Sequence, residues 1–154
     1  MFLWRVSQYT NLTGLGGELS GGRWHTKSPG KRVLYVAEHP AVALIEHLAN
    51  LGALPEFLPD HYQLLKIVAP DKIEIGELTV RQLASIDPES FPTTHAIGDR
   101  WLAAGKSAIL RVPSIPSPES WNYLLNPLHP DASQIRIEWA KTVRYDRRLF
   151  HLSK

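Results

Sequence analysis

The sequence of 154 residues contains no cysteine. Disulfide bonds, thiolate nucleophiles and thiolate zinc sites are therefore excluded together. The chain also has no run approaching the roughly 18 apolar residues that make a membrane-spanning helix. Its first ten residues, MFLWRVSQYT, lack the order of basic, apolar and small residues that marks a secretory signal. We therefore expect a cytoplasmic protein that does not associate with a membrane.

Neither sign of charge is in large excess. The 17 lysine and arginine residues nearly balance the 15 aspartate and glutamate residues, which gives a formal net charge of +2. Basic residues cluster only in KSPGKR (27–32) and RYDRR (144–148). Neither cluster alternates with aromatic residues as a surface for single-stranded nucleic acid does. We expect no direct binding of nucleic acid.

The spacing of metal ligands is also missing. His39 and His47 are eight residues apart, His25 stands alone, and the seven histidines form no HxxxH or HExxH pattern. We therefore expect no functional metal. His129, in NPLHP, better fits a histidine that fixes a loop or contacts a ligand.

The apolar pattern predicts a mixed α+β protein. Short runs of large or β-branched residues predict strands, and apolar residues three or four positions apart predict helices. The expected strands are 2–6, 32–37, 62–68, 107–112 and 135–143, and the expected helices are 41–51 and 94–104. The first two strands are expected to be neighbours in a core sheet. Residues 10–22 hold five glycines without a regular period, which predicts a loop whose backbone can lie close to a ligand.

A chain of this length suits one domain. Proline-containing stretches at 55–59, 87–92 and 113–118 interrupt the pattern, but each is too short to separate independently folding halves. We expect a single domain over residues 1–154, with a core of about 2–150.

Glu46 is the carboxylate that the helical pattern does not explain. On the expected helix it lies at the margin of the apolar stripe, beside small residues such as Ala43 and Ala49. Two interpretations are open. Glu46 faces a cleft, or it lies on the solvated edge of an amphipathic helix, which is the commoner case.

Other polar residues carry the same ambiguity. Arg5 interrupts the apolar strand FLWRV, so it either points outward or binds an anion. Arg23 follows a Gly-Gly pair and fits either a salt bridge or an anion contact. Tyr35 in VLYVA fits the core or a ligand platform, and Ser114 in VPSIPSPES fits a turn or a cap.

Five motifs in order nevertheless form a pattern: LWRVS, GGRW, VLYVAEHPAVALIEHL, ILRVPS and NYLLNPLHP. Together they resemble the RES domain family, the toxin half of RES-Xre toxin-antitoxin pairs in bacteria, over roughly residues 2–150. The family is named for an arginine, a glutamate and a serine, which match Arg5, Glu46 and Ser114. Arg23 also lies in a family-like motif and is the alternative arginine.

The resemblance implies a fold similar to that of ADP-ribosyltransferases, with a mixed sheet and flanking helices, and an enzyme that degrades NAD or transfers its ADP-ribose. Breaking the bond between nicotinamide and ribose passes through an oxocarbenium-like cation, which a carboxylate stabilises. Glu46 would supply this carboxylate, with Arg5 and Ser114 completing the catalytic set. Nicotinamide leaves as a neutral molecule, so no general acid is required.

Substrate-binding roles follow from the same resemblance. Arginines bind pyrophosphate in a bidentate manner, a tyrosine ring stacks on a cationic pyridinium, and a glycine-rich backbone approaches phosphate closely. The expected substrate-binding residues are Gly22, Arg23, Trp24, Tyr35 and Asn122. Asn122 suits a ribose or nicotinamide contact, although asparagines that tie loops together are commoner. NAD enters as the substrate, and no separate cofactor is expected.

We therefore expect a toxin that cleaves NAD, as a glycohydrolase or a phosphorylase, and so arrests growth. The resemblance implies an Xre-type antitoxin that blocks the NAD cleft, and a homodimer. Two alternatives stay open: an ADP-ribosyltransferase that modifies a specific protein, and an inert homologue that acts only as a binding module. Water, phosphate and a protein side chain can all attack the same cation, so the acceptor is also open.

Overall fold

The computed structural model of the protein describes residues 1–51 and 59–150. Within these residues a seven-stranded sheet has the strand order β4-β5-β6-β2-β1-β3-β7. Neighbouring strands are antiparallel except for β4 and β5, which are parallel. Helices accompany this mixed sheet, which confirms the α+β class.

The elements agree closely with the pattern of the sequence. The strands are β1 (Phe2–Ser7), β2 (Leu34–Ala37), β3 (His61–Val68), β4 (Ile75–Glu77), β5 (Ile109–Pro113), β6 (Trp121–Leu125) and β7 (Arg136–Arg144). The helices are α1 (Leu15–Ser20), α2 (Pro40–Asn50), α3 (Val80–Ala84) and α4 (Pro92–Ala104), with short 3-10 turns at Pro130–Gln134 and Arg147–Phe150. β1 pairs with β2 through Trp4 and Ala37, which confirms that the two strands are neighbours.

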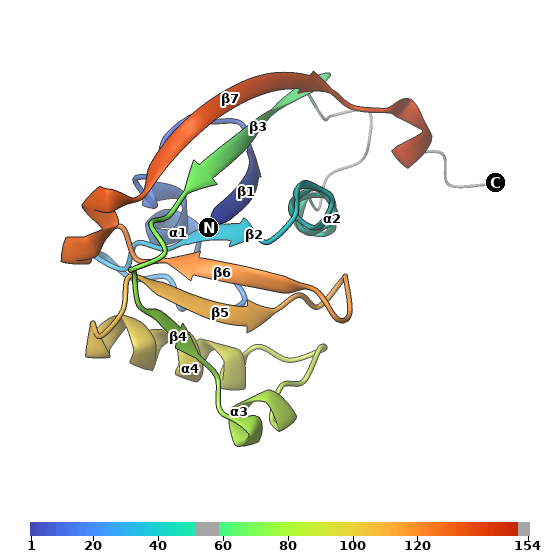
Figure 1. Ribbon diagram of the computed structural model, residues 1–154. Helices are drawn as coiled ribbons and strands as arrows, with labels where there is room; N and C mark the ends of the chain where they lie inside the picture. Colours follow the sequence, from blue (N-terminus) through green and yellow to red (C-terminus); the bar gives the residue numbers. More distant parts are fainter. Residues whose placement is uncertain (52–58, 151–154) are drawn as a thin grey trace.

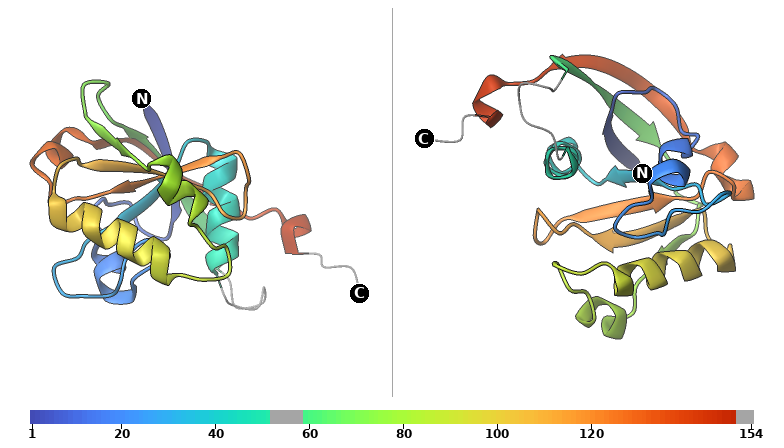
Figure 2. Two further views of the ribbon diagram at one scale, coloured as in Figure 1. Left: turned by 90° about the horizontal axis from the view of Figure 1, so that it is seen from below. Right: turned by 180° about the vertical axis from the view of Figure 1, so that it is seen from behind.

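The sheet is strongly bent (Figure 1). β1, β3 and β7 form an arch, and β2, β6, β5 and β4 form a flatter part below it. α2 lies under the arch beside β1 and β2, whereas α4 covers the flatter part near β5. Seen from behind, in the right panel of Figure 2, α1 and α2 lie at opposite ends of the space below the arch. The bend therefore brings two helices and two central strands around one region.

The glycine-rich segment 10–22 is not entirely a loop, which corrects the prediction from the sequence. α1 begins after Gly14 and ends at Gly21, and both glycines have a positive φ, of 68° and 70°. Inside α1, a Cβ on Gly17 would lie only 2.5 Å from Val33 O. Close packing against the segment before β2, rather than helical propensity, therefore holds this short helix in place.

Besides α1, three helices and strands were not predicted: β4, β6 and α3. β4 has three residues and α3 has five, which is too short for either period to appear in a sequence. α4 begins at Pro92, two residues before the predicted start, because proline is well suited to the first turn of a helix. Residues 55–58 of the first proline-containing stretch lie outside the described residues.

α2 is fixed at its N-terminus and along its apolar face. His39 caps the helix, since its side chain accepts a hydrogen bond from the backbone N–H of Ala41 at 3.2 Å. Val42 and Ala43 are buried in a cluster that also includes Val6 of β1. This packing carries the next turn of the helix, which holds the carboxylate singled out above, against the sheet.

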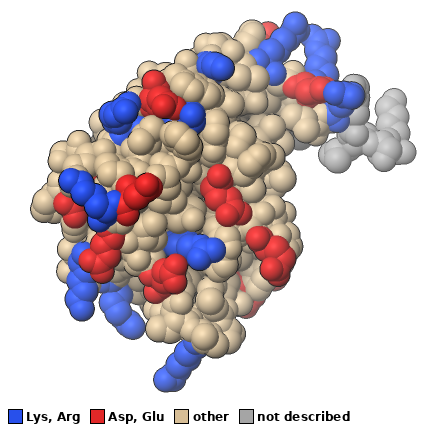
Figure 3. All heavy atoms as spheres, viewed as in Figure 1, with Lys and Arg blue, Asp and Glu red and all other residues tan. Residues whose placement is uncertain are grey.

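Membrane spans, metal sites and charged surfaces are the remaining features that bear on binding. In the described residues, no helix has both the length and the apolar character to cross a membrane, and His, Cys, Asp and Glu form no group of three or more that could hold a metal ion. Acidic and basic side chains are interspersed over the face shown in Figure 3. That face offers no surface of one sign that would neutralise a nucleic-acid backbone.

Candidate functional site

A cleft of about 500 Å³ opens among α1 with its flanking glycines, β1, β2 and α2. Its lining includes most of the residues that the sequence singled out: Arg5, Gly22, Arg23, Tyr35, Glu46 and Asn122. Ser114 and Trp24 do not line it and are buried, with exposed fractions of 5% and 2%. The expected site residues therefore gather around one cavity, and the two buried residues act on it through contacts with lining residues.

Glu46 lies half-buried in this cleft, not on a solvated edge of α2. Its Oε1 accepts hydrogen bonds from Ser114 Oγ, at 2.7 Å, and from Asn122 Nδ2. Ser114 Oγ also accepts a hydrogen bond from the backbone N–H of Ser117, at 3.2 Å. Two donors thus fix one carboxylate oxygen, whereas Oε2 has no hydrogen bond or ion pair within residues 1–51 and 59–150.

Ser114 and Asn122 both hold the carboxylate of Glu46. Ser114 is predicted to be catalytic and Asn122 to bind substrate, and each donates a side-chain hydrogen bond to Glu46 Oε1. Ser114 follows β5 and Asn122 lies in β6, so adjacent strands supply the two donors. Both residues thus orient the carboxylate, and Asn122 also lines the cleft itself.

Arg5 and Arg23 each have a buried nitrogen without a partner in the described residues. Arg5 Nη1 donates to Tyr35 O at 3.0 Å, while its Nε is left without an acceptor. Arg23 Nη2 donates to Pro88 O at 2.9 Å, and the guanidinium lies 4.3 Å from the centroid of the Phe91 ring, but Nη1 is left over. Buried donors normally have partners, so both arginines fit an anion bound in the cleft.

The cleft also holds the positive charges of these two arginines. Within the described parts of the chain, neither guanidinium forms an ion pair with an acidic side chain. Burial lowers the pKa of Arg5 from its usual value, although a guanidinium stays protonated at neutral pH. Two cationic groups without counter-ions in one cleft match the two negative charges of a pyrophosphate.

Tyr35 is fixed by its hydroxyl group. The backbone N–H of Trp24 donates to Tyr35 Oη at 3.0 Å, and His25 Nδ1 lies 2.8 Å from the same oxygen. Gly22 packs so closely against the phenol that a Cβ there would lie 2.6 Å from Tyr35 Oη. Burial raises the pKa of Tyr35, so the phenol stays neutral. Trp24, which was expected to bind substrate, instead lies in the core and holds Tyr35 through its backbone.

His47 also lines the cleft, although the sequence did not predict it as a site residue. The histidine spacing was interpreted only in terms of metal binding. His47 Nε2 lies 2.6 Å from Tyr145 Oη. Burial, with a smaller contribution from the charge of Arg5, lowers the pKa of His47, so the ring is neutral near pH 7. The position of His47 directly after Glu46 on α2 was the available signal. His129 caps a 3-10 turn by accepting from the N–H of Asp131 at 3.1 Å, so it fixes a loop.

Comparison with protein families gives a match over nearly the whole chain: the RES domain model covers residues 2–148. Toxin Res of Pseudomonas putida is 38% identical over 151 residues, covering 97% of this chain and 100% of that protein. The Prs ADP-ribosylating toxin of a Sphingobium species is 30% identical over 149 residues, covering 94% of this chain and 90% of that protein.

The fold is also found in a solved structure, the MbcT-MbcA toxin-antitoxin complex of M. tuberculosis. The match has a TM-score of 0.74 and covers 97% of this chain and 86% of the other chain. Its sequence identity is 16%, so the likeness shows a shared fold.

Proposed function

This chain belongs to the RES domain family, and we propose that it is a toxin that cleaves NAD at the bond between nicotinamide and ribose. The observation that carries the proposal is the state of Glu46. Its Oε1 is held by Ser114 and Asn122, and within residues 1–51 and 59–150 its Oε2 has no partner and the two arginines of the same cleft have no counter-ion. A fixed carboxylate beside an anion site is the arrangement that NAD cleavage needs.

The arrangement suits the parts of NAD in turn. Arg5 and Arg23 supply donors for the pyrophosphate, and the backbone around Gly22 lets phosphate oxygens approach closely. Tyr35 presents a fixed aromatic ring on the same cleft, which suits stacking against the cationic nicotinamide. With NAD bound in this way, the ribose on which positive charge develops would face Glu46, which lines the same cleft.

The proposed chemistry follows from this charge distribution. The electrons of the bond between ribose C1 and the nicotinamide nitrogen leave with nicotinamide, which becomes neutral and so needs no proton. Positive charge moves onto the ribose, and the Glu46 carboxylate stabilises it electrostatically. An acceptor oxygen then forms the new bond to C1 and releases its proton to solvent. Water as acceptor gives ADP-ribose, and phosphate gives the ADP-ribose 1-phosphate ester.

A second candidate function uses the same cation with a different acceptor. One relative that matches 94% of this chain is named a Prs ADP-ribosylating toxin, which favours transfer of ADP-ribose to a protein side chain as the alternative. The cleavage step is identical in both cases, so the same cleft residues serve either reaction. The product distinguishes them.

The biological setting that we propose is a toxin-antitoxin pair in the cytoplasm. NAD loss arrests growth, so an antitoxin is made alongside the toxin, and by family resemblance it is of the Xre type. The guanidinium groups of Arg5 and Arg23 in the cleft would donate hydrogen bonds to a carboxylate from a terminal segment of that antitoxin in place of phosphate. A homodimer is the proposed state of the toxin.

The test is to incubate the purified protein with NAD, with and without phosphate, and with and without a cell extract. Products are identified by mass spectrometry. Release of nicotinamide with ADP-ribose identifies a glycohydrolase, a phosphate-dependent ester identifies a phosphorylase, and a labelled protein identifies a transferase.

Two variants make the test specific to the site. Glu46→Gln should lose most turnover, whereas Glu74→Gln, an exposed glutamate outside the cleft, should match the wild type. Absence of any NAD-derived product from the folded wild-type protein under all conditions contradicts the proposal and favours the inert binding module.

A further inference from the structure

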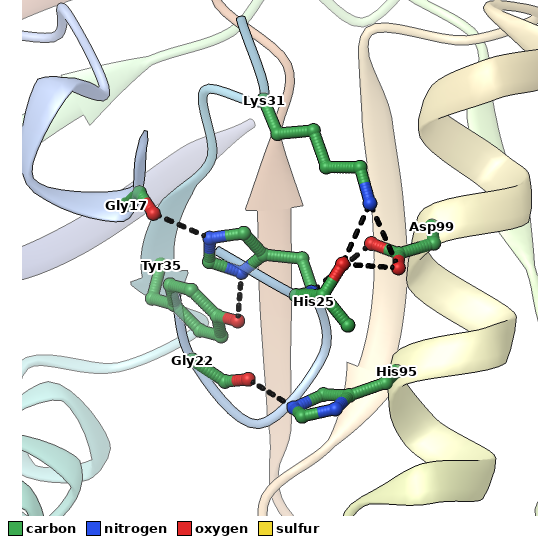
Figure 4. A network of polar contacts seen from close by, with 8 residues as sticks. Gly17, Gly22, His25, Lys31, Tyr35, His95 and Asp99 are labelled. Atoms are coloured by element: carbon green, nitrogen blue, oxygen red, sulfur yellow. Dashed lines mark hydrogen bonds and ion pairs between the residues drawn. The ribbon is translucent and has the colours of Figure 1, made fainter. Parts of the chain in front are cut away.

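His25 is a buried histidine that lies directly behind the cleft. Its exposed fraction is 0%, and it does not line the cavity. Both nitrogens of its ring have partners: Nε2 lies 2.9 Å from Gly17 O, and Nδ1 lies 2.8 Å from Tyr35 Oη (Figure 4). A buried histidine whose two ring nitrogens both form hydrogen bonds is held in one orientation.

The partners of His25 determine where its proton lies. A backbone carbonyl can only accept, so Nε2 carries the hydrogen and donates it to Gly17 O. In the neutral ring Nδ1 then has a lone pair, which accepts the hydrogen of the Tyr35 hydroxyl. The Tyr35 oxygen in turn accepts from the N–H of Trp24. Every donor in this chain of three bonds thus meets an acceptor.

The two side-chain contacts of His25 lead to two elements of the cleft lining. Gly17 belongs to α1, and Tyr35 belongs to β2, and both line the cavity. The carbonyl of Tyr35 also accepts from Arg5 Nη1, so the position of Tyr35 affects an arginine of the proposed anion site. One imidazole therefore bonds to two residues of the cleft lining at once.

His25 itself is anchored by α4. Asp99 accepts hydrogen bonds from Thr26 N at 3.1 Å and from Thr26 Oγ1 at 2.7 Å, directly after His25 in the chain. His95 Nε2 lies 2.8 Å from Gly22 O, so α4 also holds the glycine segment before it (Figure 4). His25 is therefore held by α4 through its neighbour Thr26, and its hydrogen bonds to Gly17 and Tyr35 connect that helix to the cleft.

We infer that His25 is a positioning residue for NAD turnover, which holds Gly17 and Tyr35 at the spacing that the substrate requires without touching the substrate. This inference rests on the proposed function for its kinetic readout. The hydrogen bonds of His25 to Gly17 and Tyr35 do not depend on the proposed function. Their effect on the structure can therefore be measured independently of activity.

Two conservative variants separate the two contacts. Glutamine places its amide nitrogen near the position of Nε2 and can keep the bond to Gly17, whereas asparagine places its amide near Nδ1 and can keep the bond to Tyr35. Because both Gly17 and Tyr35 must be held, neither His25→Gln nor His25→Asn is expected to keep the wild-type KM for NAD. Each should raise the KM for NAD about tenfold, with a smaller change in kcat.

The matched control is Ser107→Ala, which removes a different buried side chain that also forms two hydrogen bonds. Ser107 Oγ accepts from Trp101 Nε1 at 3.0 Å and donates to Ile109 O at 2.9 Å, and Ser107 does not line the cleft. This variant should lower the melting temperature but leave KM unchanged. A wild-type KM in both His25 variants, or an equal rise of KM in Ser107→Ala, would overturn the inference.

Hydrogen-deuterium exchange separates this inference from the proposed function. In His25→Gln, peptides that cover residues 14–22 and 33–37 should exchange faster than in the wild type, whereas in Ser107→Ala they should not. If the wild type releases no product from NAD, the proposed function fails while the exchange result still tests whether His25 holds the walls. Unchanged exchange in both segments overturns the positioning role.

Discussion

Replacing Glu46 with glutamine removes one negative charge and little else. The glutamine oxygen can still accept from Ser114 Oγ and Asn122 Nδ2, which are the contacts that hold the carboxylate. The free energy of unfolding should therefore change by no more than about 1 kcal/mol. Loss of activity in this variant would then report on charge and not on structure.

The expected size of the effect follows from Coulomb's law. A carboxylate about 4 Å from a full positive charge, in an effective dielectric of about 20, contributes about 4 kcal/mol. Glu46 is half-buried, so solvent screening reduces this figure, and part of the attraction already acts on the cationic nicotinamide before the bond breaks. A loss of about 2.7 kcal/mol from the transition state corresponds to roughly a hundredfold lower kcat.

The assay measures nicotinamide release over a range of NAD concentrations, together with thermal unfolding by circular dichroism. A kcat within about threefold of the wild-type value, in a variant that folds normally, would refute the electrostatic role. Glu46 would then be a structural acceptor for the two strands beside it.

Three other expectations can be tested with the same protein. Ser114→Ala should lower kcat about tenfold with little change in KM, because the residue orients the carboxylate without touching NAD. Calorimetric titration should show a larger loss of NAD affinity for Arg5→Ala than for Arg23→Lys, because truncation removes a guanidinium whereas lysine keeps the charge. The pKa values of His25 and His47 lie below the usual 6.5, so below this pH the unfolded chain binds protons that the folded chain does not. Urea unfolding should therefore show stability falling as the pH drops below about 6.5, by at most about 1.4 kcal/mol per pH unit for His25, and falling less in His25→Gln.

The elements that the sequence predicted are those with a complete local signal. α2 has an apolar residue every three or four positions and a proline in its first turn, and β7 alternates along nine residues. α1 has no such signal, because its sequence LGGELS contains two glycines and its place depends on contact with Val33. Periodicity therefore located the long elements, and tertiary packing decided the short ones.

In the candidate site, too, some residues have a local signal in the sequence, whereas their contacts depend on tertiary packing. Glu46 stood out because it lies at the margin of an apolar stripe, and the family motifs then favoured a cleft. Its bond to Ser114 joins residues 68 positions apart, and no local pattern contains such a contact. The same holds for His25, whose bond to Tyr35 depends on a turn between them and on α4 behind them. The sequence thus named Glu46, Ser114 and Asn122 as site residues but not the hydrogen bonds that join them.

Gly98 lies in α4, outside the cleft lining, and it allows the contacts that hold the cleft residues. A Cβ on Gly98 would lie 1.6 Å from Trp24 O, so only glycine lets α4 approach the segment that carries His25. Asp99, the next residue along the helix, then holds Thr26, and His25 holds the glycine wall and Tyr35. The spacing of the cleft walls is therefore determined by how closely α4 packs on the segment before β2. A change on a helix that does not line the cleft would alter NAD binding through this route.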